Sequence, residues 1–196
     1  MKKINRLCLL FAIIMSGLSV NGQISCEVNT TDDVGNYPDG FSGGQVGTIG
    51  ADKSPWDTFT FSDGIMSLKE AVYLINMDLC IDNEITFEDG LSGSINVSGK
   101  GIVLGNNSSS LKTIDASNVP DLKLTGGGSW GATSDAILDI SGAKNFEIIG
   151  LNISDSKSWG ISVKSKDGNS SENITFDNVT VDNSEKDGIY AEQTNN

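Results

Sequence analysis

The chain has no histidine and only one arginine, Arg6, among its 196 residues. Its 26 acidic residues outnumber the 13 basic ones, which gives a formal net charge of −13 at pH 7. Because such a chain repels phosphate groups, no nucleic-acid partner is expected. Loosely bound Ca²⁺ is conceivable, since this cation takes carboxylate oxygens, but the sequence has no contiguous Asp-x-Asp-x-Asp-Gly loop. We therefore predict a solvated acidic surface and assign no metal site and no cofactor.

The sequence also lacks a long hydrophobic run. The longest, Leu7–Val20, has fourteen residues, and a helix needs about 20 to cross a bilayer. Basic residues precede this run and Asn21-Gly22-Gln23 follows it, as in a secretory signal peptide. We expect residues 1–22 to be removed and the protein to be exported, with no transmembrane segment in the mature chain. Ten lysines would then face all 26 acidic residues, a net charge of about −16 without any arginine.

Cysteine is scarce as well. Of the three cysteines, Cys8 lies in the expected signal peptide, which leaves Cys26 and Cys80. In an oxidising compartment these two can form one disulfide. The sequence alone leaves two separate thiols as the alternative, because it does not give the distance between them.

What the chain does have is an internal repeat. Residues 145–163 and 173–191 align with a shift of 28, and Asn, Ser and Gly recur at Asn145/Asn173, Ser156/Ser184 and Gly160/Gly188. Six apolar positions also coincide: Phe146/Ile174, Ile148/Phe176, Leu151/Val179, Ile153/Val181, Ile161/Ile189 and Val163/Ala191. Alternating apolar and polar residues within each copy indicate strands with one buried face. A period of this length predicts a solenoid whose turns stack through parallel strands.

Short apolar segments extend this pattern toward the N-terminus. Strands are predicted at 85–87, 95–97, 102–104, 113–115, 122–125 and 137–140, before the paired copies at 146–149, 151–154, 160–164, 174–176, 179–182 and 188–191. About four turns fit between Ile85 and Ala191. Gly160 and Gly188 fit tight corners before a strand. Asn145 and Asn173 fit turns in which one Asn side chain bonds its equivalent in the next turn.

One helix is predicted ahead of these strands. Ser67 and Glu70 form a capping box, and the apolar residues Leu68, Ala71, Val72 and Ile75 then recur at helical spacing. We expect a helix at about residues 67–77 that covers the N-terminal end of the solenoid. Residues 23–84 would form this capping region, with a strand at 27–31 and a surface insertion at 36–57. Residues 85–196 would form the solenoid turns, and since no comparable lid follows Ala191, we expect the solenoid to be incomplete at its C-terminal end.

These segments resemble the right-handed parallel β-helix, or pectin-lyase-like, superfamily. Residues 67–72 (SLKEAV) are similar to the CSLREA motif of bacterial surface β-helix proteins, in which a strand like residues 28–33 precedes a capping helix. Met66 stands in place of the family Cys and Lys69 in place of the Arg, and residues 113–116 (TIDA) resemble an early T-I-D-G turn. The resemblance implies an all-β, right-handed parallel β-helix in a secreted or surface-displayed bacterial protein. It does not select a function, because the superfamily contains adhesins, polysaccharide lyases and glycoside hydrolases.

We favour a non-catalytic adhesion role, with a polysaccharide or a host-surface glycan as the partner. The outward positions of the repeat are rich in Ser, Thr, Asn and Asp, and a flat aromatic ring can stack on a sugar. Trp159 is the first candidate for ligand binding because the second copy has Asp187 in its place. Trp130, in a glycine-rich segment, is the second. The alternative for both is packing beneath loops.

A polysaccharide-degrading enzyme is the alternative function. The lyases of this superfamily use an Arg or Lys base beside a cation, and residues 23–196 contain no Arg. A glycoside hydrolase needs two carboxylates about 5–10 Å apart, and four acidic residues are predicted to point outward: Asp139, Asp155, Asp177 and Asp182. We expect them to be solvated turn residues instead. We assign no catalytic residue, and an active site in turns beyond this sequence stays open.

Overall fold

A computed structural model describes residues 24–32, 66–97, 101–105, 108–126, 136–166 and 168–192. The described residues form mostly parallel β-strands with one short helix, which agrees with the all-β prediction. That helix is not long and apolar enough to cross a membrane. The elements are β1 (Ile24–Val28), α2 (Leu68–Asn76), β2 (Cys80–Phe87), β3 (Gly93–Val97), β4 (Ile102–Val103), β5 (Lys112–Asp115), β6 (Leu122–Gly126), β7 (Ala136–Asp139), β8 (Lys144–Ile149), β9 (Asn152–Ser156), β10 (Trp159–Lys164), β11 (Glu172–Asp177), β12 (Thr180–Asp182) and β13 (Ile189–Glu192).

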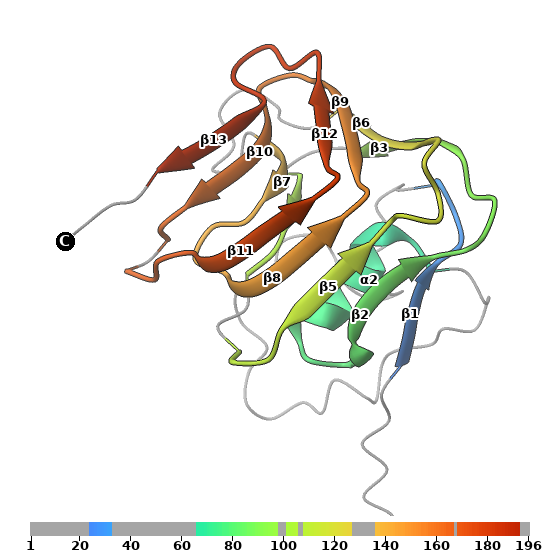
Figure 1. Cartoon of the computed structure of the whole chain (residues 1–196), viewed down its shortest axis with the longest axis horizontal. Helices are drawn as coiled ribbons and strands as arrows, with labels where there is room; N and C mark the ends of the chain where they lie inside the picture. Colours follow the sequence, from blue (N-terminus) through green and yellow to red (C-terminus); the bar gives the residue numbers. More distant parts are fainter. Residues whose placement is uncertain are drawn as a thin grey trace, which may run out of the picture.

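The strands form three parallel sheets that the chain visits in turn. The sheet orders are β1-β2-β5-β8-β11, β3-β6-β9-β12 and β4-β7-β10-β13. We call each passage through the three sheets a winding, so that β2–β3–β4 is the first winding and β11–β12–β13 the fourth of the described residues. Figure 1 shows β2, β5, β8 and β11 side by side, coloured from green to red in chain order.

The register between windings follows the 28-residue period of the sequence. Phe146 pairs with Ile174 in parallel, and Ile161 pairs with Ile189. The predicted strands are therefore present, and β2 begins earlier than expected, at Cys80. The predicted N-terminal strand at 27–31 was misplaced, because β1 begins at Ile24 and ends at Val28.

Aligned hydrophobic side chains fill the space between the sheets. One column of in-register residues comprises Ile85, Ile114, Ile148 and Phe176. The first three are almost completely buried, whereas Phe176 is only partly buried. Burying such a side chain completely contributes about 1.5–3 kcal/mol, so the first three windings hold most of the apolar stabilisation of this column.

The corners of the windings differ in part from the prediction: Gly188 lies at a bend directly before β13, as expected, but Gly160 does not. Gly150 and Asn178 occupy one corner with φ of 66° and 52°, and Asp155 and Asn183 occupy another with φ of 57° and 52°. Gly160 does not form a corner but lies within β10, where a Cβ atom would come 2.2 Å from Val181 Cγ1. Glycine is needed there because the next winding approaches its backbone, not because the chain turns.

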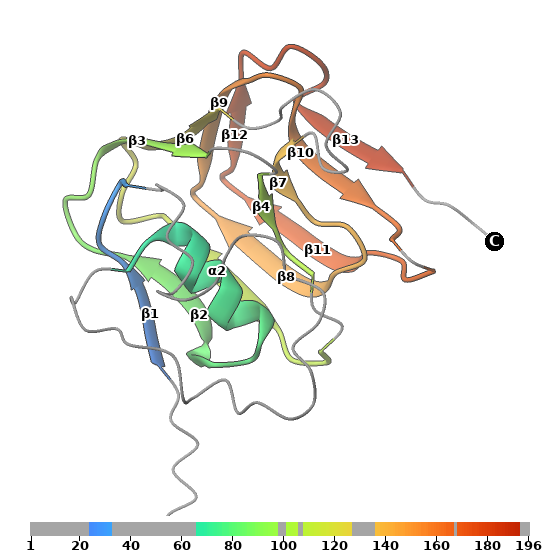
Figure 2. The ribbon, with the colours of Figure 1, turned by 180° about the vertical axis from the view of Figure 1, so that it is seen from behind.

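The predicted capping helix is present. Ser67 accepts a hydrogen bond from the Glu70 N–H, and the Glu70 carboxylate accepts one from the Ser67 N–H. The predicted apolar stripe is buried, together with Leu74. Figure 2 shows α2 against β1 and β2, which it contacts directly. The predicted insertion at 36–57 lies outside the described residues.

Polar and covalent contacts attach this helical region to the first windings. Asn76 Nδ2 donates to the Val103 carbonyl at 2.9 Å, which fixes the end of α2 to β4. Cys26 and Cys80 form a disulfide between β1 and β2. The ammonium of Lys112 is fully buried and lies 2.7 Å from Asp78 Oδ1, just beyond the end of α2.

Candidate functional site

The outer face of β10 and β13 gathers aromatic and charged side chains. Ile161 points into the core with no exposed surface. Because side chains alternate along a strand, Ser162 and Lys164 lie on the opposite face of β10, where Ser162 is covered (1% exposed) and Lys164 is partly exposed. Tyr190 and Glu192 pair with these two residues in β13 and share their face. The parallel register thus places one pair directly above the other.

Trp159, at the start of β10, completes this group. Its ring stacks on Tyr190 with the centroids 4.6 Å apart and an interplanar angle of 17°. Lys164 Nζ lies 4.4 Å from the centroid of the Trp159 ring and 5.4 Å from that of Tyr190. Lys186 Nζ lies 4.3 Å from the centroid of Trp159. We call Trp159, Lys164, Lys186 and Tyr190 the Trp159 cluster.

Cation–π attraction holds the lysines of the cluster against the rings. The negative face of an indole attracts an ammonium by about 0.5–1 kcal/mol at an exposed site. Trp159, Tyr190 and Lys164 are each partly exposed, and Lys186 is exposed. The cluster is therefore a surface feature that a ligand can reach, and it holds two ammonium groups against the rings.

An exposed carboxylate borders the cluster. The Tyr190 hydroxyl donates to Glu192 Oε2 at 2.8 Å. This hydrogen bond is the main reason why the pKa of Tyr190 is raised, followed by desolvation and by the charges of Glu192 and Asp187. Tyr190 consequently stays protonated at neutral and mildly alkaline pH. The surface then offers ammonium donors, a phenol and a carboxylate acceptor around two stacked rings.

The sequence pointed to Trp159 but not to its neighbours. Trp159 is half-buried rather than fully covered, and the stack on Tyr190 places its ring beside β13. The alternation of Ile189 and Ala191 already implied that Tyr190 points outward, and that signal was missed. The stack joins residues 31 apart, because Trp159 contacts Tyr190, and so it does not follow the 28-residue period. Trp130, the second candidate, lies outside the described residues.

The four acidic residues that were predicted to point outward have different surroundings. Asp139 was predicted to be outward and accessible, but it is only 5% exposed, and its carboxylate accepts a hydrogen bond from Ser141 Oγ. All four residues of β7 are buried, so this strand is covered on its outer side as well as on its inner side. Asp177 and Asp182 are exposed.

The pKa of Asp155 is shifted in the direction opposite to that of a general acid. Asn183 Nδ2 donates to its Oδ1, and Ser154 Oγ donates to its Oδ2. These two hydrogen bonds, in that order, lower the pKa of Asp155, with smaller contributions from Lys123 and Lys157. A carboxylic acid that protonates a glycosidic oxygen needs a raised pKa. Asp155 is therefore a structural acceptor at a corner between windings.

Among the residues that the structure describes, no group of three or more His, Cys, Asp or Glu side chains is arranged to hold a metal ion. No protein-family model, curated protein or solved structure matches the chain. The assignment of the candidate site therefore depends on its own geometry and chemistry.

Proposed function

We propose that this chain is an exported, right-handed parallel β-helix that binds glycans without degrading them, in the manner of a bacterial surface adhesin. The β-helix is supported by the regular passage of the chain through three parallel sheets. Connections between parallel strands of one sheet are right-handed in about 98% of cases, which supports the handedness. Export is supported by the basic start and the short apolar run of residues 1–22.

The Trp159 cluster is the observation that carries the binding role. Sugars present apolar C–H faces together with hydroxyl groups, and binding sites for such molecules combine aromatic surface with a few placed polar groups. The cluster has two stacked rings, two ammonium groups and the neighbouring Glu192 carboxylate. Since Tyr190 already covers part of Trp159, the sugar would contact the exposed remainder of the ring pair, and the lysines would donate to its hydroxyls.

Binding without catalysis is favoured by the surroundings of two of the four acids that were predicted to point outward. The pKa of Asp155 is lowered, chiefly by its hydrogen bond from Asn183, and Asp139 is buried. The role proposed here needs neither of them. It requires only that the outer surface of β10 and β13 remains rigid while a saccharide occupies it.

A glycan array with the purified mature protein tests this function. Trp159→Ala should reduce binding to the recognised glycan by at least tenfold, a loss of about 1.4 kcal/mol, because it removes the stacking surface. Lys186→Ala should reduce it by about threefold, since one exposed contact contributes about 0.5–1 kcal/mol. Tyr190→Phe keeps the stack but removes the hydroxyl, and it should weaken binding only modestly. Lys166→Ala is the matched control, because Lys166 is an exposed lysine outside the cluster.

Folding must be separated from binding in this experiment. Trp159 connects β10 to β13, so its removal also destabilises the last winding. Lys186→Ala leaves both rings in place and serves as the variant that alters the surface alone. Binding that is unchanged in Lys186→Ala and Trp159→Ala, with melting curves showing folded protein, would remove the cluster from the proposed role.

A further inference from the structure

The fourth winding ends in three unpaired strand edges. β11, β12 and β13 are each the terminal strand of their sheet within the described residues. An edge strand presents a row of N–H and C=O groups that can pair with another strand. The inward side chains of this winding are also uncovered, since Ile189 is 50% exposed whereas its register partner Ile161 is 0% exposed. This end of the molecule therefore has both an apolar surface and a hydrogen-bonding edge.

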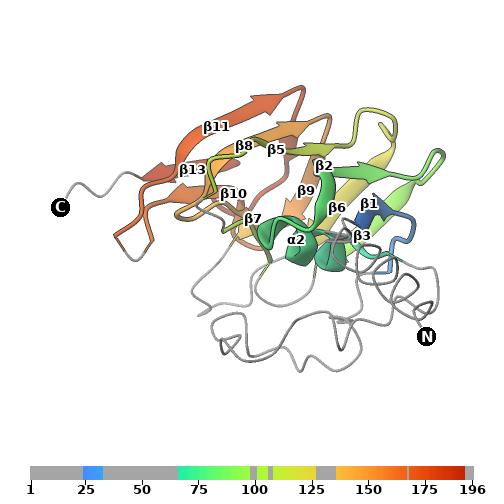
Figure 3. The same cartoon turned by 90° about the horizontal axis from the view of Figure 1, so that it is seen from below.

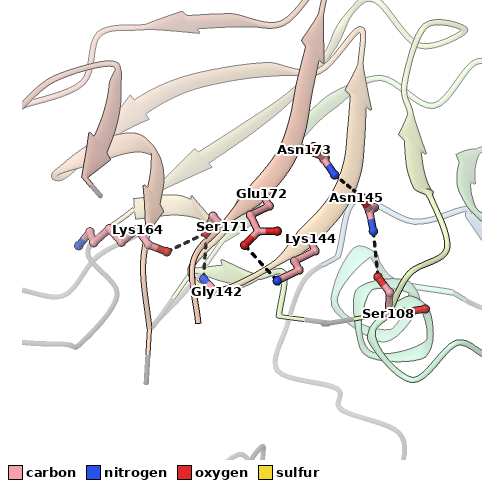
Figure 4. A network of polar contacts seen from close by, with 8 residues as sticks. All are labelled: Ser108, Gly142, Lys144, Asn145, Lys164, Ser171, Glu172 and Asn173. Carbon is pink, nitrogen blue, oxygen red and sulfur yellow. Dashed lines mark hydrogen bonds and ion pairs between the residues drawn. The ribbon is translucent and has the colours of Figure 1, made fainter. Parts of the chain in front are cut away.

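Side-chain ladders with the same period run toward this edge (Figure 4). Asn145 Nδ2 donates to the Ser108 carbonyl at 3.1 Å, and Asn173 Nδ2 donates to Asn145 Oδ1 at 2.9 Å. On the next sheet, Thr180 Oγ1 donates to Asn152 Oδ1, again 28 residues away. Each winding thus adds a donor to an acceptor of the winding before it, and an Asn in a further winding would donate to Asn173 in the same way.

Ion pairs between windings show the same order. Lys144 Nζ lies 3.1 Å from Glu172 Oε1, and Lys157 Nζ lies 3.6 Å from Glu185 Oε1. In both pairs the third winding supplies the lysine and the fourth winding the glutamate. The carboxylates of Glu172 and Glu185 are about half exposed, and a lysine on the other side would extend each pair into an alternating ladder.

The charge of this end argues against a second copy as its partner. Residues 172–192 contain six acidic residues and one lysine, Lys186. Two copies placed end to end would bring two acidic rims together, and such like-charge contact is unfavourable. A partner with lysines at matching positions would instead neutralise the rim.

We propose that the end formed by β11, β12 and β13 is a docking surface for a further parallel winding with this 28-residue pattern. The partner carries Asn opposite Asn173 and Lys opposite Glu172 and Glu185. Apolar residues of the partner cover Ile174, Phe176 and Ile189. The proposal depends on the observed strand register and is independent of glycan binding.

An extended protein tests the proposal. A copy of residues 165–192 is fused directly after Glu192, with Lys in place of the copied Glu172 and Glu185. Amide hydrogen exchange of residues 174–191 in the original winding should slow by about tenfold or more, because edge amides become paired and covered. A fusion of the same composition in scrambled order is the matched control and should leave exchange unchanged. Equal exchange in both fusions would overturn the proposal.

Two further measurements make the result specific. Ile189→Asp should abolish the added protection in the extended protein, since it places a charge beneath the docked winding. Protection that survives Ile189→Asp would show that the extension docks elsewhere and would overturn the proposal. Sedimentation of the unextended chain should give a monomer at tens of micromolar. A dimer with slowed exchange in β11–β13 would identify a second copy as the occupant and would also overturn it.

Discussion

The two ends of the stack of windings differ in how well their apolar side chains are covered. At the first end, β1 and α2 cover β2, and the Cys26–Cys80 disulfide ties β1 to it. At the other end, β11, β12 and β13 carry half-exposed hydrophobic side chains. Figure 3 shows α2 near β1 and β2, with β11 and β13 toward the opposite end. Equivalent repeat positions therefore differ in stability according to whether a neighbour covers them on both sides.

The column of Ile85, Ile114, Ile148 and Phe176 illustrates this dependence. The sequence pattern is the same in each winding, and the register aligns all four residues. Ile85 is buried although it belongs to the first winding, because Cys26 of β1 pairs with it on the far side. Phe176 has a neighbour on one side only among the described residues, and it is partly exposed. The substitutions below test this difference in stability between the two ends.

Opening the disulfide should produce the largest effect. Cys26 and Cys80 are 54 residues apart, and closing a loop of this length stabilises the folded state by about 4 kcal/mol in the chain-entropy treatment. The double variant Cys26→Ala/Cys80→Ala should show a fall of this size in the free energy of unfolding, measured with guanidinium chloride. A reducing agent should shift the unfolding midpoint of the wild type toward that of the variant. Because the variant has no disulfide, the same agent should leave its midpoint in place. Equal midpoints for the oxidised wild type and the variant would contradict the prediction.

A matched pair of truncations compares the middle of the stack with its open end. Ile161 and Ile189 are in register, but one is fully buried and the other half-exposed. Ile161→Ala should lower the free energy of unfolding by about 2–5 kcal/mol, because it leaves a cavity in a closed core. Ile189→Ala should lower it by less than about 1 kcal/mol, because much of that side chain is already in water. Denaturant titration of both variants measures the difference, and equal losses would show that the fourth winding is covered in solution.

The buried ion pair near α2 should give a smaller effect. Asp78→Asn leaves the fully buried Lys112 ammonium without its carboxylate partner and should destabilise the fold by about 2 kcal/mol. This figure is below the range for fully buried pairs, because the Asp78 side chain is 49% exposed. Asn tolerates the positive φ of 58° at this position.

Lys112→Met is the matched control for that pair. It removes the buried charge and keeps an apolar chain of similar length above Phe146. Thermal unfolding should therefore show a smaller loss for Lys112→Met than for Asp78→Asn. A larger loss in the Met variant would mean that the ammonium stabilises the fold through contacts other than Asp78.

The sequence was sufficient for those features that are repeated or local. The 28-residue shift predicted the pairing of Phe146 with Ile174, and the Asn145–Asn173 side-chain bond is present as expected. The capping box of Ser67 and Glu70 also formed as predicted. In each case the determining interaction lies between neighbours in the chain or between equivalent positions of the repeat, so periodicity alone contains the information.

Features that depend on contacts outside the period were not predicted. The corners at Asn178 and Asn183 were not assigned from the sequence, because Asn adopts positive φ at low cost and gives no glycine signal there. Asp139 is buried because the outer side of β7 is covered too, which no local pattern reveals. The stack of Trp159 on Tyr190 joins positions that are not equivalent in the repeat. The candidate site was therefore only partly foreseen, through a single tryptophan.

The smallest expected effect concerns the corner contact between Asp155 and Asn183. Hydrogen bonds from Asn183 and then from Ser154 lower the pKa of Asp155. A carboxyl group whose pKa is lower in the folded state stabilises that state above its unfolded pKa, and this contribution disappears as the pH falls through the folded pKa. Asn183→Gly removes the first hydrogen bond and keeps a residue that tolerates the φ of 52°. The pKa of Asp155 should then rise toward its ordinary value, and the stability difference from the wild type should shrink below about pH 4. A carboxyl-carbon NMR titration measures this pKa directly.

Asn173→Gly is the control, since Asn173 has a similar φ of 55° but donates to Asn145 instead. If both glycine variants leave the pKa of Asp155 at its wild-type value, then the hydrogen bond from Asn183 to Asp155 is not formed in solution. The fourth winding would then be held to the third by one contact fewer than the structure indicates.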